Sequence, residues 1–358
     1  MRAFVLSGYG GPEHTALAEV PKPSPRAGEL LVRVEAAGLN PVDFKTRSGA
    51  LKMIRDYPLP VVMGNELAGV VAAVGAGVTR FAEGDRVFAR MDKDDMGALA
   101  EFAVVHEDHA ARMPASLDFP TAAAVPLAAL TALQALRDEL QLRAGQRIFI
   151  PGGAGGVGSF AIQLAKHMGA HVATTASSRG EALVRRLGAD VVIDYTRERF
   201  EDRLSGYDCA FDLIGGDTLS RLFRVLKPGA RVVSVAGLPE PQTARKDLGR
   251  GPALAALFWL ASLTTRLRAA RHGASYRYLF MHPSGSDLAH LAALIDAGQL
   301  DVIVDRVAWT PFAWPVIGGR ALALDPSRRD AADNDVVESW CAATSVGEDG
   351  ERGTPGAP

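Results

Sequence analysis

The most informative stretch of this chain is Pro151-Gly152-Gly153-Ala154-Gly155-Gly156-Val157-Gly158. It follows a short apolar run typical of a buried strand and precedes a run of helical length and period, Ser159 to Met168. Gly153, Gly155 and Gly158 take the three glycine positions of the G-x-G-x-x-G fingerprint. Alone, this pattern could be an ordinary glycine-rich turn. Between a strand and a helix it indicates a dinucleotide-binding unit.

The chemistry of such a loop explains why glycine is required in it. Glycine makes the tight turn, lets the backbone approach a pyrophosphate and packs the helix closely on the strand. A side chain at Gly155 would block the phosphate, and the helix N-terminus supplies free N–H groups and partial positive charge. We therefore expect cofactor contacts from Gly153, Gly155, Gly156, Val157 and Gly158.

The end of the next strand predicts which nucleotide binds. An NAD site uses an Asp or Glu about 20 residues further on to accept from the ribose hydroxyls. This strand instead ends at Ser177, Ser178 and Arg179, with no carboxylate. Small hydroxyls followed by a guanidinium suit a ribose 2′-phosphate, which arginine can pair bidentately. We expect NADPH as the cofactor; the alternative is a solvated turn with an ordinary surface arginine.

Strands and helices alternate on the C-terminal side of this loop. This alternation predicts an α/β fold with a doubly wound parallel Rossmann sheet over residues 119–298, introduced by an Ala-rich helix from about Phe119 through Leu136. The expected strands are Arg147 to Pro151, His171 to Thr175, Val191 to Ile193, Tyr207 to Leu213, Ala230 to Ala236 and Tyr276 to Met281. A helix is expected from Leu288 to Ala297.

Residues 1–118 have a different sequence pattern, in which short strands are separated by Gly and Pro. This pattern predicts a compact β barrel, completed by residues from about 299 to 324 with a strand near Val302 to Val307. The clearest strands of the barrel are Leu30 to Glu35, Gly69 to Val74, Asp85 to Ala89 and Ala100 to Val105.

Composition excludes several classes of protein. The 358 residues carry 39 Lys and Arg against 41 Asp and Glu, a net charge of −2, so no uniform field draws in nucleic acid or anionic membrane. Two cysteines, Cys209 and Cys341, cannot form a disulfide framework or a four-cysteine zinc site. The first residues lack an apolar run typical of a signal peptide, and we expect a cytoplasmic protein.

Two segments lie outside this two-domain pattern. Pro252 to His272 is expected to be one helix whose apolar face gives way to arginines; it could lie on a membrane, but packing on its own domain is the plainer interpretation. Residues 325–358 are polar, acidic and rich in glycine, which predicts a disordered tail.

Several motifs resemble one family in a single consistent order from about Met1 to Phe312. They are Gly10-Gly11-Pro12-Glu13, Ala36-Ala37-Gly38-Leu39-Asn40-Pro41-Val42-Asp43, Val74-Gly75-Ala76-Gly77-Val78, Gly84-Asp85-Arg86-Val87, Pro126 to Ala132, Leu187-Gly188-Ala189-Asp190, Ile193-Asp194-Tyr195 and Leu226-Lys227-Pro228-Gly229. The chain thus resembles the zinc-independent medium-chain dehydrogenase/reductases, in the quinone oxidoreductase and enone (alkenal) reductase branch. The resemblance implies a GroES-like barrel joined to a Rossmann domain.

Zinc ligands of the zinc-dependent relatives are replaced in this sequence. Their places look like Asn40, Asn65 in Gly64-Asn65-Glu66, and a residue near Ala129, none of which is a good zinc ligand. We therefore expect no metal. Substrates should then need little polarisation, such as quinones or α,β-unsaturated carbonyl compounds that accept hydride at the β carbon.

The resemblance also implies roles for single residues. Asn40 and Lys45 are the candidate catalytic residues, with a turn cap and a solvated lysine as the alternatives. Four further cofactor contacts carry over: Thr131 near the nicotinamide, Tyr195 near the adenosine phosphate, and Gly215 and Gly237 at strand ends. Tyr195 could equally be a core aromatic. Phe280 and Met281 could shape the substrate pocket or belong to the core.

The resemblance further implies a homodimer, with the strand Tyr276 to Met281 pairing with its twin. Relatives close the barrel with a strand that this chain lacks after Phe312, so we expect an unpaired edge unless Arg320 to Leu324 supplies a strand. Two other functions stay open: a nucleotide-binding sensor or structural protein without turnover, and a lipid or polyketide-type enoyl reductase.

Overall fold

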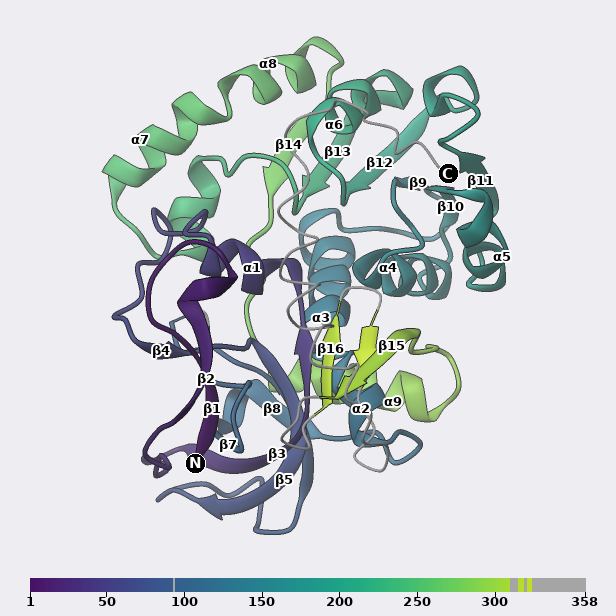
Figure 1. Ribbon diagram of the computed structural model, residues 1–358. Helices are drawn as coiled ribbons and strands as arrows, with labels where there is room; N and C mark the ends of the chain where they lie inside the picture. The colour runs from purple at the N-terminus through teal and green to yellow at the C-terminus, as the bar shows by residue number, and fades with distance from the viewer. Residues whose placement is uncertain (93, 310–314, 319–320, 324–358) are drawn as a thin grey trace, which may run out of the picture.

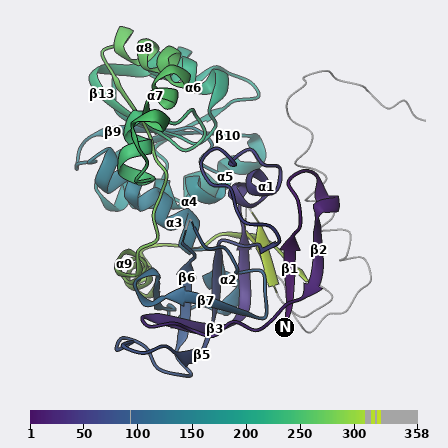
Figure 2. The ribbon, with the colours of Figure 1, turned by 90° about the vertical axis from the view of Figure 1, so that its left-hand side faces the viewer.

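The computed structural model describes residues 1–92, 94–309, 315–318 and 321–323. They form two domains. In Figure 1 the Rossmann domain is at the top and the barrel domain at the bottom, and in Figure 2 helices α3 and α4 lie between them. Both predicted domain types are confirmed.

The barrel domain is organised around β3, which runs from Glu29 to Leu39. It pairs antiparallel with β5 and with β7, and its alternate residues fill the core. The short helix α1, Pro41–Arg47, starts directly after β3, with Pro41 in its first turn. The other strands of this domain are β1 (Arg2–Leu6), β2 (Thr15–Glu19), β4 (Val61–Val62), β5 (Glu66–Val74), β6 (Arg86–Arg90), β7 (Phe102–His106) and β8 (Ala110–Arg112).

The Rossmann sheet has six parallel strands in the order β11-β10-β9-β12-β13-β14. Chain order reverses between β9 and β12, and in such sheets ligands bind beyond the carboxyl ends of the strands at that switch point. The strands are β9 (Arg147–Ile150), β10 (His171–Ala176), β11 (Val191–Asp194), β12 (Tyr207–Asp212), β13 (Leu226–Ser234) and β14 (Ser275–Tyr278). The predicted extension of the last strand to Met281 is wrong, because β14 ends at Tyr278.

The expected Ala-rich helix is two helices, α2 (Phe119–Ala123) and α3 (Pro126–Gln134), followed by a π turn over Ala135–Glu139. The break falls where Pro126 lacks the N–H that a continuous helix would need. The remaining helices of the sheet layers are α4 (Gly156–His167), α5 (Ser178–Arg186), α6 (Gly216–Leu222) and α9 (Gly285–Asp296).

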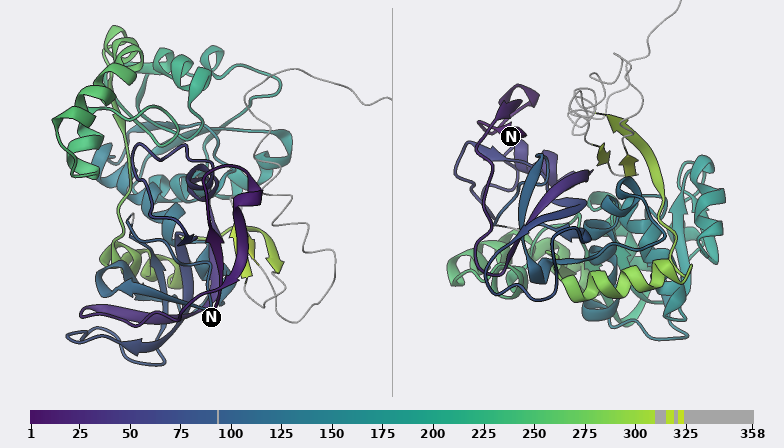
Figure 3. Two further views of the ribbon diagram at one scale, coloured as in Figure 1. Left: turned by 60° about the vertical axis from the view of Figure 1, so that its left-hand side comes forward. Right: turned by 90° about the horizontal axis from the view of Figure 1, so that it is seen from below.

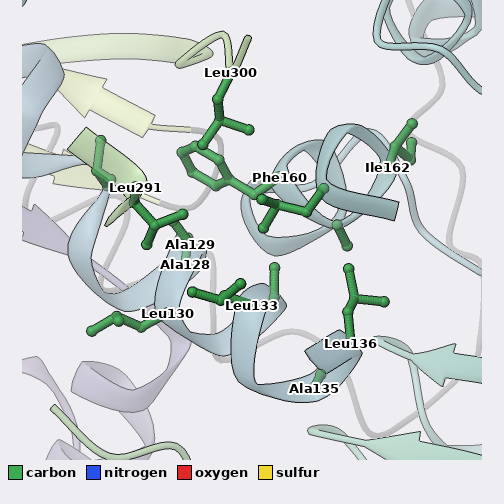
Figure 4. Packing of buried hydrophobic residues seen from close by; sticks show 14 of the residues in the cluster. Ala128, Ala129, Leu130, Leu133, Ala135, Leu136, Phe160, Ile162, Leu291 and Leu300 are labelled. Atoms are coloured by element: carbon green, nitrogen blue, oxygen red, sulfur yellow. The ribbon is translucent and has the colours of Figure 1, made fainter. Parts of the chain in front are cut away.

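One apolar cluster joins the two domains. It contains Leu133 of α3, Phe160 of α4 and Leu291 of α9, which point toward one another in Figure 4, together with Ala68 and Phe88 of the barrel. Because a continuous buried core holds both domains, the groups on either side of the boundary have a fixed relation to one another.

The segment predicted as one helix over Pro252 to His272 is also two helices. Helix α7 (Pro252–Ala261) and helix α8 (Leu263–Arg271) meet at Ser262. The buried Ser262 hydroxyl donates to the carbonyl oxygen of Phe258 at 2.6 Å, a back-bond that bends helices.

The C-terminal strands extend the barrel sheet beyond β3. They are β15 (Val304–Trp309), β16 (Pro315–Gly318) and β17 (Ala321–Ala323). The prediction of an unpaired edge is wrong for β3, because β16 pairs with β3 in parallel. The alternative, a strand within Arg320 to Leu324, is confirmed: β17 pairs with β15. The tail predicted to be disordered, residues 325–358, lies outside the described residues.

Candidate active site

The glycine loop connects β9 to α4 and is held by the neighbouring strand β10. The N–H of Gly152 donates to the Thr175 hydroxyl at 2.9 Å, and the N–H of Gly153 donates to the Thr174 hydroxyl at 3.0 Å. Thr174 in turn donates to the carbonyl oxygen of Ile150. Gly152 has a φ of +81°, which favours glycine. Two threonine hydroxyls therefore fix the turn before the helix begins.

The glycines of this loop are required for different physical reasons. A Cβ on Gly153 would lie 2.1 Å from Oγ1 of Thr174, and one on Gly158 would lie 2.5 Å from the Gly152 carbonyl oxygen, so close packing excludes a side chain at both. At Gly155 the nearest atom to such a Cβ is that same oxygen at 3.4 Å, an ordinary contact, and its φ of −80° suits any residue. Packing does not require glycine at Gly155, whereas a bound pyrophosphate would.

The rest of the loop fits that ligand. Gly155 is the N-cap of α4, and Gly156, Val157 and Gly158 form its first turn, whose N–H groups have no partner within the helix. A helix N-terminus attracts anions through these groups and through its dipole. The five predicted loop residues therefore form one cradle, and they fit a dinucleotide.

The predicted phosphate-reading residues lie beside this cradle. A Cβ on Gly180 of α5 would lie 2.9 Å from that of Ala154, so the start of α5 packs directly on the loop. Ser177 is the N-cap of α5, and Ser178 and Arg179 are exposed in its first turn. Tyr195, which follows β11, is 63% exposed, so the alternative that it is a core aromatic is wrong.

Two further strand ends are joined by a buried pair that the sequence did not single out. Ser234 at the end of β13 donates to Oδ2 of Asp212 at the end of β12, at 2.6 Å. Asp212 accepts from the N–H of Gly215, and Ser234 accepts from the N–H of Gly237. Burial raises the pKa of Asp212. This pair fixes the loops that carry the two glycines predicted to contact the cofactor.

On the barrel side, a buried polar network occupies the places of the zinc ligands in zinc-dependent relatives. Asn40 donates through Nδ2 to Oε1 of Glu66 at 2.5 Å, and Asn65 donates through Nδ2 to Oδ1 of Asp43 at 2.6 Å. The other oxygen of Asp43 accepts from the Asn40 N–H. Arg90 lies in the same buried group and donates to the Asn65 carbonyl oxygen.

The network continues onto helix α3. Oε2 of Glu66 accepts from the N–H of Leu127 at 2.6 Å, and one turn later the Thr131 hydroxyl donates to the Leu127 carbonyl oxygen. Asn40 and Thr131, predicted from different parts of the chain, are thus joined through Glu66 and Leu127. Within the described residues, no group of three or more His, Cys, Asp and Glu side chains could hold a metal ion.

Both carboxyl groups of the network have perturbed acidity. Burial raises the pKa of Asp43 to about 6 and that of Glu66 to about 7, and their hydrogen bonds and Arg90 oppose the shift. Burial also lowers the pKa of Arg90. Asp43 and Glu66 are therefore buried carboxyl groups whose pKa values lie near neutral pH.

These shifts predict how stability depends on pH. An unfolded carboxyl loses its proton near pH 4, while the folded ones keep theirs up to about 6 and 7. The free energy of unfolding should therefore fall as pH rises from about 4 to about 7 and change little above that. Denaturant titrations across this range should show a smaller fall for Glu66→Gln, whereas the exposed control Glu83→Gln should match the wild type. Parallel curves for all three proteins would contradict this account.

A pocket of about 290 Å³ opens between the two domains next to the network. Asn65 and Arg90 lie on one side of it, and Leu248 and Phe280 of the Rossmann domain lie on the other. Phe280 lines this pocket and also packs against the small core cluster of Leu248 and Phe258, whereas Met281 packs against the large core cluster.

The pocket also contains Tyr57, whose pKa burial raises to about 12. Lys45 lies in the last turn of α1, partly buried, and its ammonium has no hydrogen bond or ion pair with any described residue. No sequence signal pointed to Tyr57 or Arg90. Asp43 and Glu66, by contrast, belong to the quoted motifs, and their role could have been inferred from them.

The fold and this site together define a nucleotide-dependent dehydrogenase or reductase of the two-domain type. Residues 26–115 match the model of the alcohol dehydrogenase GroES-like domain, and residues 156–264 match that of the zinc-binding dehydrogenase. The chain belongs to the medium-chain dehydrogenase/reductase family, in its zinc-independent branch with quinone and alkenal oxidoreductases.

Three similar proteins support this assignment. The chain is 42% identical to a chloroplastic NADPH-dependent alkenal/one oxidoreductase of Arabidopsis thaliana over 67% of this chain and 64% of that protein, just under two thirds of its length. It is 36% identical to the mitochondrial NAD(P)H oxidoreductase RTN4IP1 of Danio rerio over 86% of this chain and 84% of that protein. The structure of the quinone oxidoreductase from Coxiella burnetii is 30% identical in sequence and superposes with a TM-score of 0.74. The match covers 86% of this chain and 90% of that chain.

Proposed function

We propose that this protein reduces quinones or α,β-unsaturated carbonyl compounds with NADPH and without zinc. The observation that carries the proposal is the pairing of an open glycine cradle at Gly155 with amide side chains, Asn40 and Asn65, at the places of the zinc ligands. Reduction of a conjugated substrate adds a hydride at the β carbon and a proton to the resulting enolate. Such a reaction needs a hydrogen-bond donor at the carbonyl oxygen, which a metal need not supply.

NADPH, when bound, supplies the hydride, and the chain supplies binding, orientation and the proton donor. The glycine cradle would hold the pyrophosphate, and Ser177, Ser178 and Arg179 would hold the 2′-phosphate. Gly215 and Gly237 would let the backbone approach the cofactor at the strand ends, Tyr195 would contact the adenosine phosphate, and Thr131 would contact the nicotinamide end. The pocket beside Phe280 takes the substrate.

Lys45 and Asn40 have the catalytic roles in this proposal. The Lys45 ammonium has no internal partner among the described residues, so it is available to donate to a substrate carbonyl oxygen. Asn40 is held by Glu66 and by its own N–H bond to Asp43, which gives its amide a fixed orientation in the buried network that also contains the pocket residue Asn65.

A substrate panel tests the proposed function. NADPH oxidation is followed with quinones, enones and simple ketones, each repeated with NADH and with a chelator. The proposal requires turnover of quinones or enones that the chelator leaves unchanged. Activity restored only by added zinc would contradict it. Tight NADPH binding without turnover would favour the sensor alternative, and turnover confined to acyl thioesters would favour the enoyl reductase.

Preference for NADPH should depend on Arg179. Arg179→Ala should weaken NADPH binding by about 1.5–3 kcal/mol, the usual range for a hydrogen bond to a charged group, and leave NADH binding nearly unchanged. Calorimetric titration with both nucleotides measures this. Arg186→Ala, an exposed arginine later in the same helix, is the matched control. Equal losses for both nucleotides would show that Arg179 does not contact the 2′-phosphate.

The proposal includes a homodimer and a cytoplasmic location. Among the described strands, β14 lies at the edge of the Rossmann sheet and pairs with β13 alone, so a second copy could pair on its other side. A light-scattering mass of a monomer at micromolar concentration would contradict the dimer. No helix of the described residues is long and apolar enough to cross a bilayer. The two relatives named above are chloroplastic and mitochondrial, so cell fractionation is needed for the location.

A further inference from the structure

Helices α7 and α8 carry an exposed apolar surface that the proposed reductase activity does not use. Leu257, Trp259, Leu260 and Leu267 are exposed by 42%, 45%, 64% and 50%. In Figures 1 and 3 the two helices follow one another along the outer side of the Rossmann domain, with the α7 end toward the barrel and α8 farther from it. The inner side of the pair is anchored by buried Phe258 and Ala269.

The exposed residues recur at helical spacing. Leu257, Leu260, Thr264, Leu267 and Arg271 are three or four residues apart, and all five are exposed. Within α7 this spacing places Leu257 and Leu260 on one face, and within α8 it places Thr264, Leu267 and Arg271 on one face. We define these five residues, with Trp259 and Arg268, as the rim face.

A basic pocket of about 290 Å³ lies at the α8 end of the rim face. It is lined by Arg224, Arg268 and Arg271, with Arg221 and Asp217 already paired to each other at 2.8 Å. Within the described residues, Arg224 and Arg271 have no hydrogen bond or ion pair, and Arg268 only donates to the Ser220 hydroxyl. Unpaired guanidinium groups around a pocket favour an anionic ligand with phosphate oxygens.

Charge selects among the possible occupants of this surface. From Leu248 to Gly273 the sequence contains four arginines and no Asp or Glu. A second copy packed symmetrically on the rim face would bring like charges together, because a two-fold contact joins the same patch to itself. Nucleic acid would satisfy the arginines but leave the leucines in water.

An anionic bilayer satisfies both parts of the rim face. Leucines enter the acyl boundary, arginines bind headgroup phosphates, and tryptophan prefers the interface between them. Trp259 already lies under the Arg266 guanidinium, at 5.8 Å from its ring centre. We propose that the rim face docks this protein on an anionic lipid surface, with phosphate headgroups bound between Arg224, Arg268 and Arg271.

Vesicle co-sedimentation of the full-length chain tests this docking. We expect the protein to sediment with phosphatidylcholine vesicles that contain phosphatidylglycerol, to stay in solution with pure phosphatidylcholine, and to be released by high salt. Each basic residue near such a surface contributes about fivefold in partition, so Arg268→Glu/Arg271→Glu should lower partition by at least about 25-fold. The control Arg26→Glu/Arg143→Glu has the same charge change on exposed arginines outside the rim face.

A second variant separates insertion from charge attraction. Leu257→Ser/Leu260→Ser should lower partition at least about tenfold, while Leu17→Ser/Val74→Ser, exposed apolar residues of the barrel, should not. Vesicles should also shift the emission of the wild type to the blue, and Trp259→Phe should lose that shift. Equal partition for each variant and its control would overturn the proposal.

The outcomes are independent of the reductase activity. Both rim-face variants should reduce a water-soluble enone at the wild-type rate, so a failure of docking leaves the proposed function untouched. If the protein binds inorganic pyrophosphate in a manner that requires Arg271 but does not bind vesicles, the proposal of membrane docking is overturned. The ligand of the basic pocket would then be a soluble phosphate compound.

Discussion

Replacing Gly155 with valine should abolish nucleotide binding without destabilising the fold. The position has ordinary backbone angles, φ −80° and ψ 172°, and a Cβ there would make only an ordinary contact, 3.4 Å from the Gly152 carbonyl oxygen. The fold can therefore accept a side chain there, but a pyrophosphate seated on the helix N-terminus cannot. We expect the Kd for NADPH to rise at least about 100-fold, or ~2.7 kcal/mol, while the thermal midpoint stays close to that of the wild type.

Gly251 provides the matched control. It is the N-cap of α7 with φ −71° and ψ 178°, and a Cβ there would meet no atom within 4 Å. Gly251→Val therefore makes the same change at the same kind of position, and it should bind NADPH like the wild type. If Gly155→Val does not fold, Gly155→Ala keeps the test available. Wild-type affinity in a folded Gly155 variant would show that the nucleotide does not bind at this loop.

Loss of the Lys45 ammonium should have the second large effect, this time on the chemical step. Lys45→Met keeps the length and packing of the side chain but removes the donor. Removing one preorganised donor to a developing oxyanion lowers kcat by about 100- to 1,000-fold. We expect that loss in kcat for an enone, with little change in the Kd for NADPH, because the lysine acts on the substrate carbonyl.

The control for this variant is Lys52→Met. Lys52 is exposed and follows α1 in the chain, and its ammonium lies 3.9 Å from an Asp56 carboxylate oxygen and 5.2 Å from the centre of the Tyr9 ring. It should retain wild-type kcat. A Lys45→Met enzyme with unchanged kcat would remove Lys45 from the mechanism and leave the solvated-lysine interpretation.

The sequence predicted the architecture well because both domains have strong local signals. The glycine fingerprint lies between β9 and α4, and β9 contains a buried apolar run from Ile148 to Ile150. Errors occurred at two local helix breaks and at one long-range strand pairing. Pro126 divides the Ala-rich helix, Ser262 divides the insert, and β16 pairs with β3 although the segment bearing it departs from the family motifs.

The candidate site was predictable only in part. Asn40 and the loop glycines stand in motifs, so spacing alone finds them. The network that holds Asn40 combines Glu66, 26 residues later, with the N–H of Leu127, 61 residues beyond that, and no local pattern predicts that such distant residues meet. Asp212 and Ser234 were missed for the same reason, since each ends a different strand.

The most direct test of the central claim follows the hydride itself. The purified chain is treated with a chelator and given NADPH labelled with deuterium at the transferred position, together with an enone. We expect one deuterium at the β carbon of the reduced product, at an undiminished rate, and none when Gly155→Val is used. Unlabelled product, or a reaction that stops with the chelator and resumes with zinc, would contradict a zinc-independent NADPH reductase.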